Sequence, residues 1–516
     1  MKSIVLVATL VAALGSALAF SPPAARAGAE LVAARATATP SPTPAPIPTA
    51  SPEPPQIAIP RLEAALKANP NDRDAMIELA GQFLGLGSPQ ATQAALQLTQ
   101  RVMQLGTKTA QVYFLDGAAQ QGLGNLPAAI YDLESASNLE PTSLTILQQL
   151  AELYLRTNPP RFADAERIAN RAVTFNKSEP GAYVTLGLVL AAEQKWDQSR
   201  AQFDQAYQLD PKNIAPLIQE AQTWVAQNTL PNALAAIDRA IAADPKNVQA
   251  LVFRAQIYQR QNNISASAQA FDDAITAAGN NYQKAGIIVQ KALMYATAKQ
   301  PAQAQAIFDG AIRDYPTISS LHTAYGEYWL ANRQNARAQS QFLQAVKIDK
   351  TDTSALLDLA QMKMAARQPA SAANYLKQLA EVAPSPQSFA LLGQAYVSAH
   401  QYPQARAACI ASFQMARSPD TLACIAGSDY NLKSYKEAAN IFGILDAQGG
   451  AYLSQHPDLL YMTAVSYQKT NQRTKAANAF KKLLKMMKPG TKEYKQIQAQ
   501  IRSLSGAVSP KSTARK

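Results

Sequence analysis

A set of residue types recurs about every 34 residues over most of this chain, and this periodicity limits the possible fold more than any other feature. A short unit of this kind can bury its apolar face only against its neighbours, so the pattern predicts a stacked array rather than several independent domains. Twelve copies can be followed, and they begin near residues 73, 110, 144, 180, 214, 248, 285, 319, 353, 386, 419 and 457.

Each copy has the composition of two short helices. Ala, Gln and Leu are abundant and favour helix, whereas alternating Val, Ile and Thr runs typical of strands are scarce. A Pro near the end of many copies stops the second helix, because it lacks an N–H and clashes with the preceding turn. Asp210-Pro211-Lys212-Asn213 and Asp244-Pro245-Lys246-Asn247 are typical of turns and helix caps.

The pattern resembles the tetratricopeptide repeat, in which a large residue, Leu, Gly or Ala and Tyr in a first helix precede Ala, Phe, Ala and Pro in a second. One clear copy carries Tyr183, Leu186, Gly187, Phe203, Ala206 and Pro211. The resemblance implies an all-α, right-handed superhelical solenoid of about twelve helix-turn-helix units with terminal capping helices. Expected segments are a signal peptide (1–19), a disordered linker (20–59), a capping helix (60–72), the solenoid (73–490), and a second capping helix with a basic tail (491–516).

The first residues have the pattern of an export signal. Lys2 precedes an uncharged apolar run, and Ala17-Leu18-Ala19 offers the small side chains that a signal peptidase accepts. Cleavage after Ala27 and retention as an uncleaved anchor are the alternatives. The Pro-, Thr- and Ala-rich stretch that follows favours an extended, hydrated spacer. We therefore expect an exported protein, periplasmic or extracellular and possibly held at the envelope, with no membrane span after cleavage.

Most of the formal net charge of +12 lies at the C-terminal end. The segment Lys481–Lys516 has a single acid, Glu493, and ten bases: Lys481, Lys482, Lys485, Lys488, Lys492, Lys495, Arg502, Lys511, Arg515 and Lys516. Such a tail can hold an anionic polymer or membrane, or it can simply keep a final helix soluble. The sequence gives no reason to expect specific nucleic-acid binding.

The sequence offers no pattern of a catalytic or cofactor site. It lacks G-x-S-x-G, HExxH, P-loop and dinucleotide motifs, and its two Cys and three His show no metal-ligand spacing. His322 falls at a bulky first-helix position, His400 at an inter-helix turn, and His456 just before a helix. We therefore expect no enzyme activity, no cofactor and no metal.

The two cysteines fall on consecutive helices of the expected solenoid. Cys409 belongs to the second helix of copy ten and Cys424 to the first helix of copy eleven. In an oxidising compartment they could form a disulfide, which would close a loop of about 16 residues and add about 3 kcal/mol in the chain-entropy model. Two small buried thiols are the alternative.

The resemblance also implies that first helices line a concave groove that takes a peptide or a partner helix. Carried over position by position, the family's groove would be apolar and rich in amides, which suits an extended ligand, although the Gln residues can also be plain solvated helix formers. The function expected is an exported protein-interaction scaffold for envelope assembly or chaperoning, with a surface tether on the basic tail as the alternative. Groove candidates are Phe114, Gln148, Glu152, Val184, Gln222, Val252, Gln256, Gln259, Glu327, Gln361 and Gln394.

Overall fold

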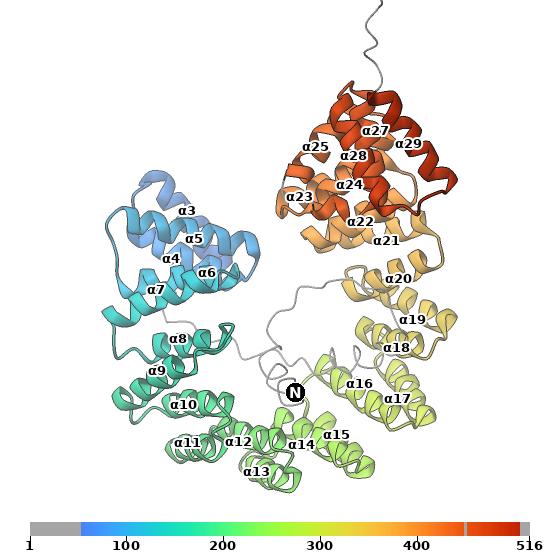
Figure 1. The fold of residues 1–516 in the computed structure, drawn as a ribbon. Coiled ribbons are helices and arrows are strands. Elements are labelled where there is room, and N and C mark those ends of the chain that lie inside the picture. Colours follow the sequence, from blue (N-terminus) through green and yellow to red (C-terminus); the bar gives the residue numbers. More distant parts are fainter. Residues whose placement is uncertain (1–52, 448–450, 506–516) are drawn as a thin grey trace, which may run out of the picture. The chain divides into compact units, whose positions relative to one another are not determined.

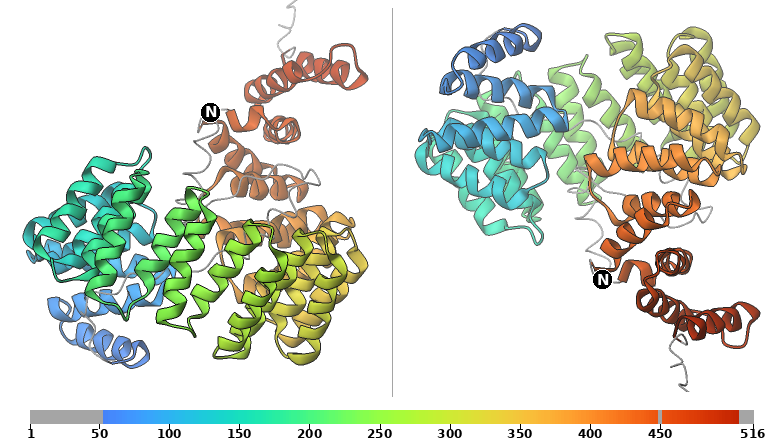
Figure 2. Two further views of the ribbon diagram at one scale, coloured as in Figure 1. Left: turned by 90° about the horizontal axis from the view of Figure 1, so that it is seen from below. Right: turned by 90° about the horizontal axis from the view of Figure 1, so that it is seen from above.

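A computed structural model describes residues 53–447 and 451–505, which contain 27 helices and no strand. The chain divides into two compact units, Met1–Ile307 (unit 1) and Phe308–Lys516 (unit 2), each described here by itself. Helices follow one another in antiparallel pairs, as Figures 1 and 2 show. The expectation of an all-α solenoid of helix-turn-helix units is therefore confirmed, while the predicted signal peptide and most of the linker lie outside the described residues.

Unit 1 begins with the single helix α3 (Pro55–Ala68) and continues in first and second helices. In order these are α4 (Arg73–Leu86), α5 (Pro89–Gln104), α6 (Ala110–Gly122), α7 (Leu126–Leu139), α8 (Leu144–Arg156), α9 (Phe162–Phe175), α10 (Pro180–Ala192), α11 (Trp196–Leu209), α12 (Ala215–Ala226), α13 (Leu230–Ala243), α14 (Val248–Arg260), α15 (Ile264–Ala277) and α16 (Asn281–Thr297), and α17 (Pro301–Asp314) crosses the boundary to unit 2.

Unit 2 continues the alternation. Its helices are α18 (Ser319–Ala331), α19 (Asn335–Ile348), α20 (Thr353–Ala365), α21 (Pro369–Val382), α22 (Pro386–Ser398), α23 (Tyr402–Met415), α24 (Pro419–Asn431), α25 (Tyr435–Ala447), the one-turn α26 (Ala451–Ser454), α27 (Pro457–Lys469), α28 (Arg473–Met486) and α29 (Lys492–Ser505). Most first helices begin at the residue where the repeat pattern places them; α12 begins one residue later and α16 four residues earlier.

The recurring residues form the core within each helix pair. Second helices of six repeats each contribute one fully buried phenylalanine, and small residues let the paired helix approach it. Gly187 in α10 is one such residue, because a Cβ built there would lie 2.5 Å from Cε1 of Phe203 in α11. The six rings belong to Phe203, Phe271, Phe308, Phe342, Phe442 and Phe480.

Local hydrogen bonds fix the helix starts and the turns. Asn247 caps α14 by accepting from the backbone N–H of Ala250 at 3.1 Å, and Asp244 accepts from the N–H of Lys246 at 3.2 Å. Turns from first to second helices often contain one left-handed residue, such as Asn228 and Asn262, a conformation that asparagine adopts more readily than most residues.

The helix at the start of unit 1 is longer than the sequence predicts. Helix α3 begins at Pro55, within the expected linker, and runs through Pro60 to Ala68. Pro55 lies at the helix start, where its missing N–H costs nothing. Ala58 and Leu62 are buried against Ala75 and Leu79, and this burial holds the helix together across Pro60.

Candidate interaction surface

Several first helices of unit 1 lie side by side in a layer. Beyond neighbours in sequence, α4 contacts α6, α8 contacts α10, and α10 contacts α12. In Figure 1, α8, α10 and α12 lie on one side of this part of unit 1, and α9, α11 and α13 on the other. Side chains on the face of this layer that points away from the second helices are therefore placed where a ligand could contact several repeats at once.

The structure divides the eleven groove candidates between the two units. Eight belong to unit 1, and Glu327, Gln361 and Gln394 belong to unit 2. Five of those in unit 1 are half-buried residues of successive first helices, and we call these five the amide row: Val184, Gln222, Val252, Gln256 and Gln259. Gln148 is also half-buried, whereas Glu152 is exposed.

Phe114 does not fit a ligand-facing role. Its side chain is only 4% exposed and belongs to a core cluster that includes Leu115, Leu133 and Leu147. Burial of an aromatic side chain in this cluster stabilises the helix pair and leaves no face for a partner. The same repeat position is half-buried at Gln148 and Val184, whereas here the aromatic ring packs into the core.

Several candidate amides bridge consecutive first helices. Gln148 Nε2 donates to the backbone oxygen of Gly181 at 3.0 Å. Gln256 Nε2 lies 3.4 Å from Gln290 Oε1, and Gln259 Nε2 donates to Thr297 Oγ1 at 3.2 Å. Gln290 and Thr297 were not among the sequence candidates. The longer helix α16 shifts the repeat positions by three residues, so neither residue falls at an expected groove position. Gln290 nevertheless follows Gln256 by one repeat length.

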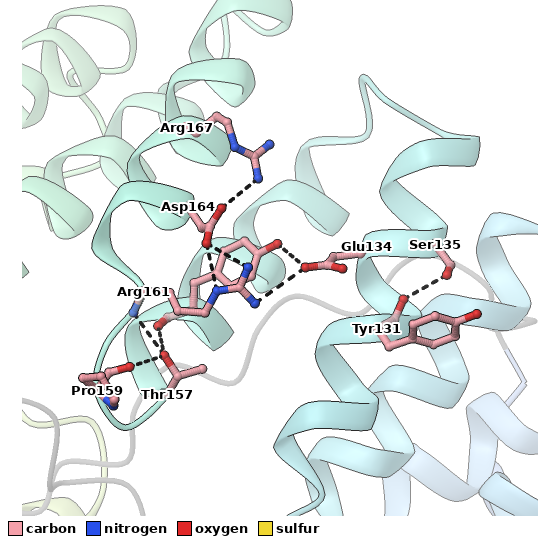
Figure 3. A network of polar contacts seen from close by, with 9 residues as sticks. Tyr131, Glu134, Ser135, Thr157, Pro159, Arg161, Asp164 and Arg167 are labelled. Atoms are coloured by element: carbon pink, nitrogen blue, oxygen red, sulfur yellow. Dashed lines mark hydrogen bonds and ion pairs between the residues drawn. The ribbon is translucent and has the colours of Figure 1, made fainter.

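A second polar network braces the long connection between α8 and α9 (Figure 3). The Tyr154 hydroxyl donates to Glu134 at 2.6 Å, and the Arg161 guanidinium lies over the Tyr154 ring at 4.4 Å. Burial and the Glu134 carboxylate raise the pKa of Tyr154, and hydrogen bonds from Arg167 and Arg161 lower the pKa of Asp164. The extra residues at 158–160 were the sequence signal for this feature.

A shallow cavity of about 440 Å³ lies beside this network. Apolar side chains of α7 line it, and its charged groups, Glu134 of α7 and Arg161, are already bound within the network. We therefore infer that the network stabilises the longer connection between α8 and α9. The lining residues are Leu126, Pro127, Ile130, Tyr131, Glu134, Thr157, Asn158 and Arg161.

Two carboxyl groups meet in the core of the α5–α7 region. Asp116 in α6 and Asp132 in α7 are 4% and 6% exposed, and Thr99 Oγ1 in α5 donates to Asp116 Oδ1 at 2.5 Å. Burial and the hydrogen-bonded Asp116 raise the pKa of Asp132 to about 7. The pair can therefore share a proton near neutral pH.

The cysteines and histidines have structural surroundings. Cys409 and Cys424 are joined by a disulfide, with their Cα atoms 6.1 Å apart. His322 is buried with Nδ1 2.7 Å from Gln341 Oε1, His400 contacts Tyr402 in a turn, and His456 packs on Tyr452. Among residues 53–447 and 451–505, no group of three or more His, Cys, Asp or Glu side chains could hold a metal ion.

The described part of the basic tail is exposed on α28, α29 and the turn between them. Lys482 pairs with Asp446 at 2.6 Å, while Lys481, Lys485, Lys488, Lys492 and Lys495 extend into solvent. Lys511, Arg515 and Lys516 lie outside the described residues. No helix in the described part of the chain is both long and apolar enough to cross a membrane.

Sequence comparison identifies the repeat. Residues 218–282 match the family described as Tetratricopeptide repeat. The chain carries tetratricopeptide repeats. Other copies in both units keep the same helix pairing and the same buried positions. Proteins with these repeats bind protein or peptide partners, so the fold indicates a protein-interaction scaffold. The search of curated proteins found no match.

Solved structures also resemble this chain at low sequence identity. The yeast Tom70 structure shares 16% identity over 74% of this chain and 93% of its own, with a TM-score of 0.35. The APC/C hetero-tetramer Cut9–Hcn1 shares 13% identity over 87% of this chain and 93% of its own, with a TM-score of 0.31. YrrB, described as a TPR protein with an unusual peptide-binding site, shares 20% identity over 37% of this chain and 95% of its own, with a TM-score of 0.30. These likenesses are too distant to indicate a partner.

Proposed function

We propose that this protein is an exported, non-enzymatic scaffold that binds an extended peptide or partner segment on the amide row of unit 1. The observation that carries the proposal is the half-exposed position of these five side chains on three successive first helices, of which α10 and α12 are in contact. A ligand lying across the layer would contact three repeats at once, from α10 to α14.

The chemistry of the amide row suits an extended polypeptide. Val184 and Val252 provide apolar contacts, and the side-chain amide of Gln222 makes no hydrogen bond to a described residue. An amide can donate to a backbone carbonyl and accept from a backbone N–H, so such a row can pair with main-chain groups while valines contact side chains. The bonds that Gln256 and Gln259 make to the next first helix hold their side chains in place.

Two observations support export. The residues preceding Ala19 have the order of a signal peptide, and the Cys409–Cys424 disulfide is typical of proteins that fold in an oxidising compartment. We place the protein in the cell envelope, where a scaffold would assemble or chaperone other exported proteins.

The test is a crosslinking pull-down from the envelope fraction with the full exported chain as bait. The groove variant combines Gln222→Arg with Gln256→Arg, which adds bulk and charge to the amide row. The matched control combines Gln198→Arg with Gln208→Arg, two exposed residues of the second helix α11 that carry the same added charge. We expect wild type and control to enrich the same exported proteins and the groove variant to lose them. Equal recovery by all three baits would overturn the proposal.

A second function rests on the basic tail. The exposed lysines of α28 and α29 could tether the protein to an anionic membrane or wall polymer. Deleting α29 would uncover core residues, because Ile497, Ile501 and Leu504 pack against the last repeat, so substitutions are the better test. Replacing Lys481, Lys485, Lys488, Lys492 and Lys495 by Gln should abolish salt-sensitive binding to phosphatidylglycerol vesicles if the tail is a tether. Unchanged binding would exclude this function.

A further inference from the structure

Unit 2 has one edge with a strong excess of positive charge. This turn edge consists of the turns from first to second helices, with the last helical turn before and the first helical turn after each. Its acids are Asp429, which is buried and bonded to Arg406, and Glu437. Its bases are Arg333, Arg337, Lys363, Arg367, His400, Lys433, Lys436, Lys469, Arg473 and Lys475.

The opposite edge of unit 2 has the reverse balance, which shows that the positive edge is not a general property of the surface. Counted in the same way as far as α27, the turns that join one repeat to the next carry Arg313, Lys347, Lys350 and Arg417, and the histidines His322 and His456. They carry the acids Asp314, Asp349, Asp352, Glu381, Asp420, Asp446 and Asp458.

Four residues at the centre of the turn edge occupy equivalent positions in four consecutive repeats. Arg333, Arg367, His400 and Lys433 are all left-handed, with φ between 57° and 63°. Each backbone N–H donates to the carbonyl three residues earlier, at 2.9 to 3.0 Å. Because the backbone geometry is the same, the four exposed side chains leave the solenoid at the same point of each repeat.

Backbone conformation does not explain this choice of residues. Glycine and asparagine are the residues that adopt left-handed conformations most readily. At the corresponding turns, unit 1 uses Gly or Asn four times, as Gly87, Gly124, Asn228 and Asn262, and it also uses Gln194 and Lys299. A basic residue at the end of a helix does gain from the helix dipole. However, Arg473 and Lys475 lie in the first turn of α28, where the dipole disfavours cations, so helix energetics alone cannot account for the edge.

The central cations are also without internal counterions. In the described chain, Arg333, Arg367 and Lys433 form no ion pair with a carboxylate, and the same holds for Lys436, Lys469 and Arg473. Many bases of unit 1 do pair with an acid, Arg239 and Arg254 with two each. The turn edge thus presents uncompensated charge to a partner.

Arg333, Arg367 and His400, at the centres of the first three turns, are each followed by a glutamine. Gln334, Gln368 and Gln401 stand at the N-caps of α19, α21 and α23, and none of their side chains caps the helix. A basic residue and an amide therefore stand next to each other in each of these three turns. Carboxylates suit the cations, and backbone amides suit the glutamines, so this pairing matches an acidic polypeptide better than a lipid surface.

The aromatic residues of this edge do not offer the stacking faces that single-stranded nucleic acid uses. Trp329 is only 5% exposed, and the Arg337 guanidinium covers its ring at 4.5 Å. Tyr402 and Tyr435 are half-buried against His400 and Tyr430.

We propose that the turn edge of unit 2 binds an extended acidic segment of a partner protein. Packed helices lie about 8 to 10 Å apart. First helices α22, α24 and α27 contact one another in sequence order. An extended chain advances about 3.3 to 3.6 Å per residue, so one basic residue per repeat fits an acid at about every third residue. This surface is separate from the amide row, and the inference does not depend on the function proposed for it.

The test uses the full chain and a fluorescein-labelled peptide of about fifteen residues with the repeat Glu-Gly-Ser, measured by fluorescence anisotropy. The edge variant combines Arg333→Asn, Arg367→Asn and Lys433→Asn, since Asn already adopts this conformation at Asn228 and Asn262. The matched control combines Lys347→Gln, Lys350→Gln and Arg417→Gln at the opposite edge and removes the same charge. Both variants keep the basic tail. We expect the edge variant to lose at least about tenfold in affinity and the control less than about threefold.

Three results would overturn the proposal. Equal losses by edge variant and control would show a response to net charge alone. A second peptide has the same composition but all its Glu residues in one block. If the wild-type chain binds this peptide as tightly as the Glu-Gly-Ser repeat, the proposed spacing of the acids is wrong. If the edge variant loses binding to polyuridylate or to phosphatidylglycerol vesicles while its peptide binding is unchanged, the edge binds nucleic acid or membrane instead.

Discussion

At the scale of single residues, close contact between a helical glycine and a phenylalanine ring recurs in both units. A Cβ built on Gly326 would lie 2.5 Å from Cε1 of Phe342, as it would for Gly187 and Phe203. The sequence pattern indicated glycine at these positions because two helices must touch. The structure adds that the ring itself fills the space that a Cβ would need.

We predict that Gly187→Ala and Gly326→Ala each destabilise their repeat by about 1 to 3 kcal/mol, because the added methyl group overpacks a filled core. Gly286→Ala is the control, since a Cβ built on this exposed residue of α16 meets nothing within 4 Å. Alanine there should stabilise the helix by up to about 1 kcal/mol. Urea denaturation followed by circular dichroism measures all three. A stable Gly187→Ala variant would mean that Phe203 can move aside at little cost.

The Asp116–Asp132 pair makes the stability of its repeat depend on pH. The folded-state pKa of Asp132, about 7, lies above its ordinary value of 3.8, so the folded state retains the proton between these values. Stability should therefore decrease as the pH rises from about 4 to about 7 and change little above that.

We expect Asp132→Asn to flatten this dependence between pH 5 and pH 8. The readout is hydrogen exchange of α6 and α7, corrected for the intrinsic effect of pH on exchange. Asp74→Asn, at an exposed residue of α4, is the control and should leave the dependence in place. An equally steep dependence in Asp132→Asn would show that other groups cause it.

At the scale of helices, repeat periodicity predicted helix starts well, and it failed where tertiary contacts decide. Helix α16 begins four residues early because Asn280 caps it by accepting from the N–H of Gln283 at 2.9 Å. Helix α3 crosses Pro60 because of burial that a proline-rich stretch does not reveal. For the candidate site, the pattern placed the amide row on first helices. It could not show that Phe114 would be buried or that Gln148 would bond to Gly181.

The disulfide gives a prediction for one pair of helices. Cys409 in α23 takes the position that phenylalanine fills in other repeats, and it joins α23 to Cys424 of α24. The chain-entropy model gives about 3 kcal/mol for a loop of this length. Reduction should therefore increase hydrogen exchange in α23 and α24 and leave α10 and α11 unchanged. The unreduced, denatured protein should contain no thiol that can be alkylated, and two alkylated thiols would contradict the bond.

At the scale of the whole molecule, the repeats depend on their immediate neighbours, as expected for a solenoid. Buried clusters lie within one repeat or span a few consecutive ones, such as the cluster of α12, α13 and α14 around Ile237. Each of these clusters stays within a few consecutive repeats, and the longest of them runs from Ala110 to Leu190.

We therefore predict that a strong core change acts locally. Phe342→Ala in α19 removes a fully buried ring and should cost about 3 to 5 kcal/mol in its own repeat. Hydrogen exchange should rise from α18 to α21, while α6 to α9 keep their protection. Uniform loss of protection along the chain would mean that the array unfolds as one cooperative body.

Single helices, α3 and α29, cover the two described ends of the repeat array and oppose the stacking of one copy on another. Helix α3 covers α4 with Ala58 and Leu62 and turns Arg61, Glu63 and Lys67 to solvent. At the other end, α29 covers the last repeat with Ile497 and exposes Lys492, Lys495 and Arg502. A repeat array with bare apolar ends is a template for its own polymerisation, because any copy can stack on any other. Here each described end shows a charged face, so stacking of one copy on another would first require one of these two helices to detach.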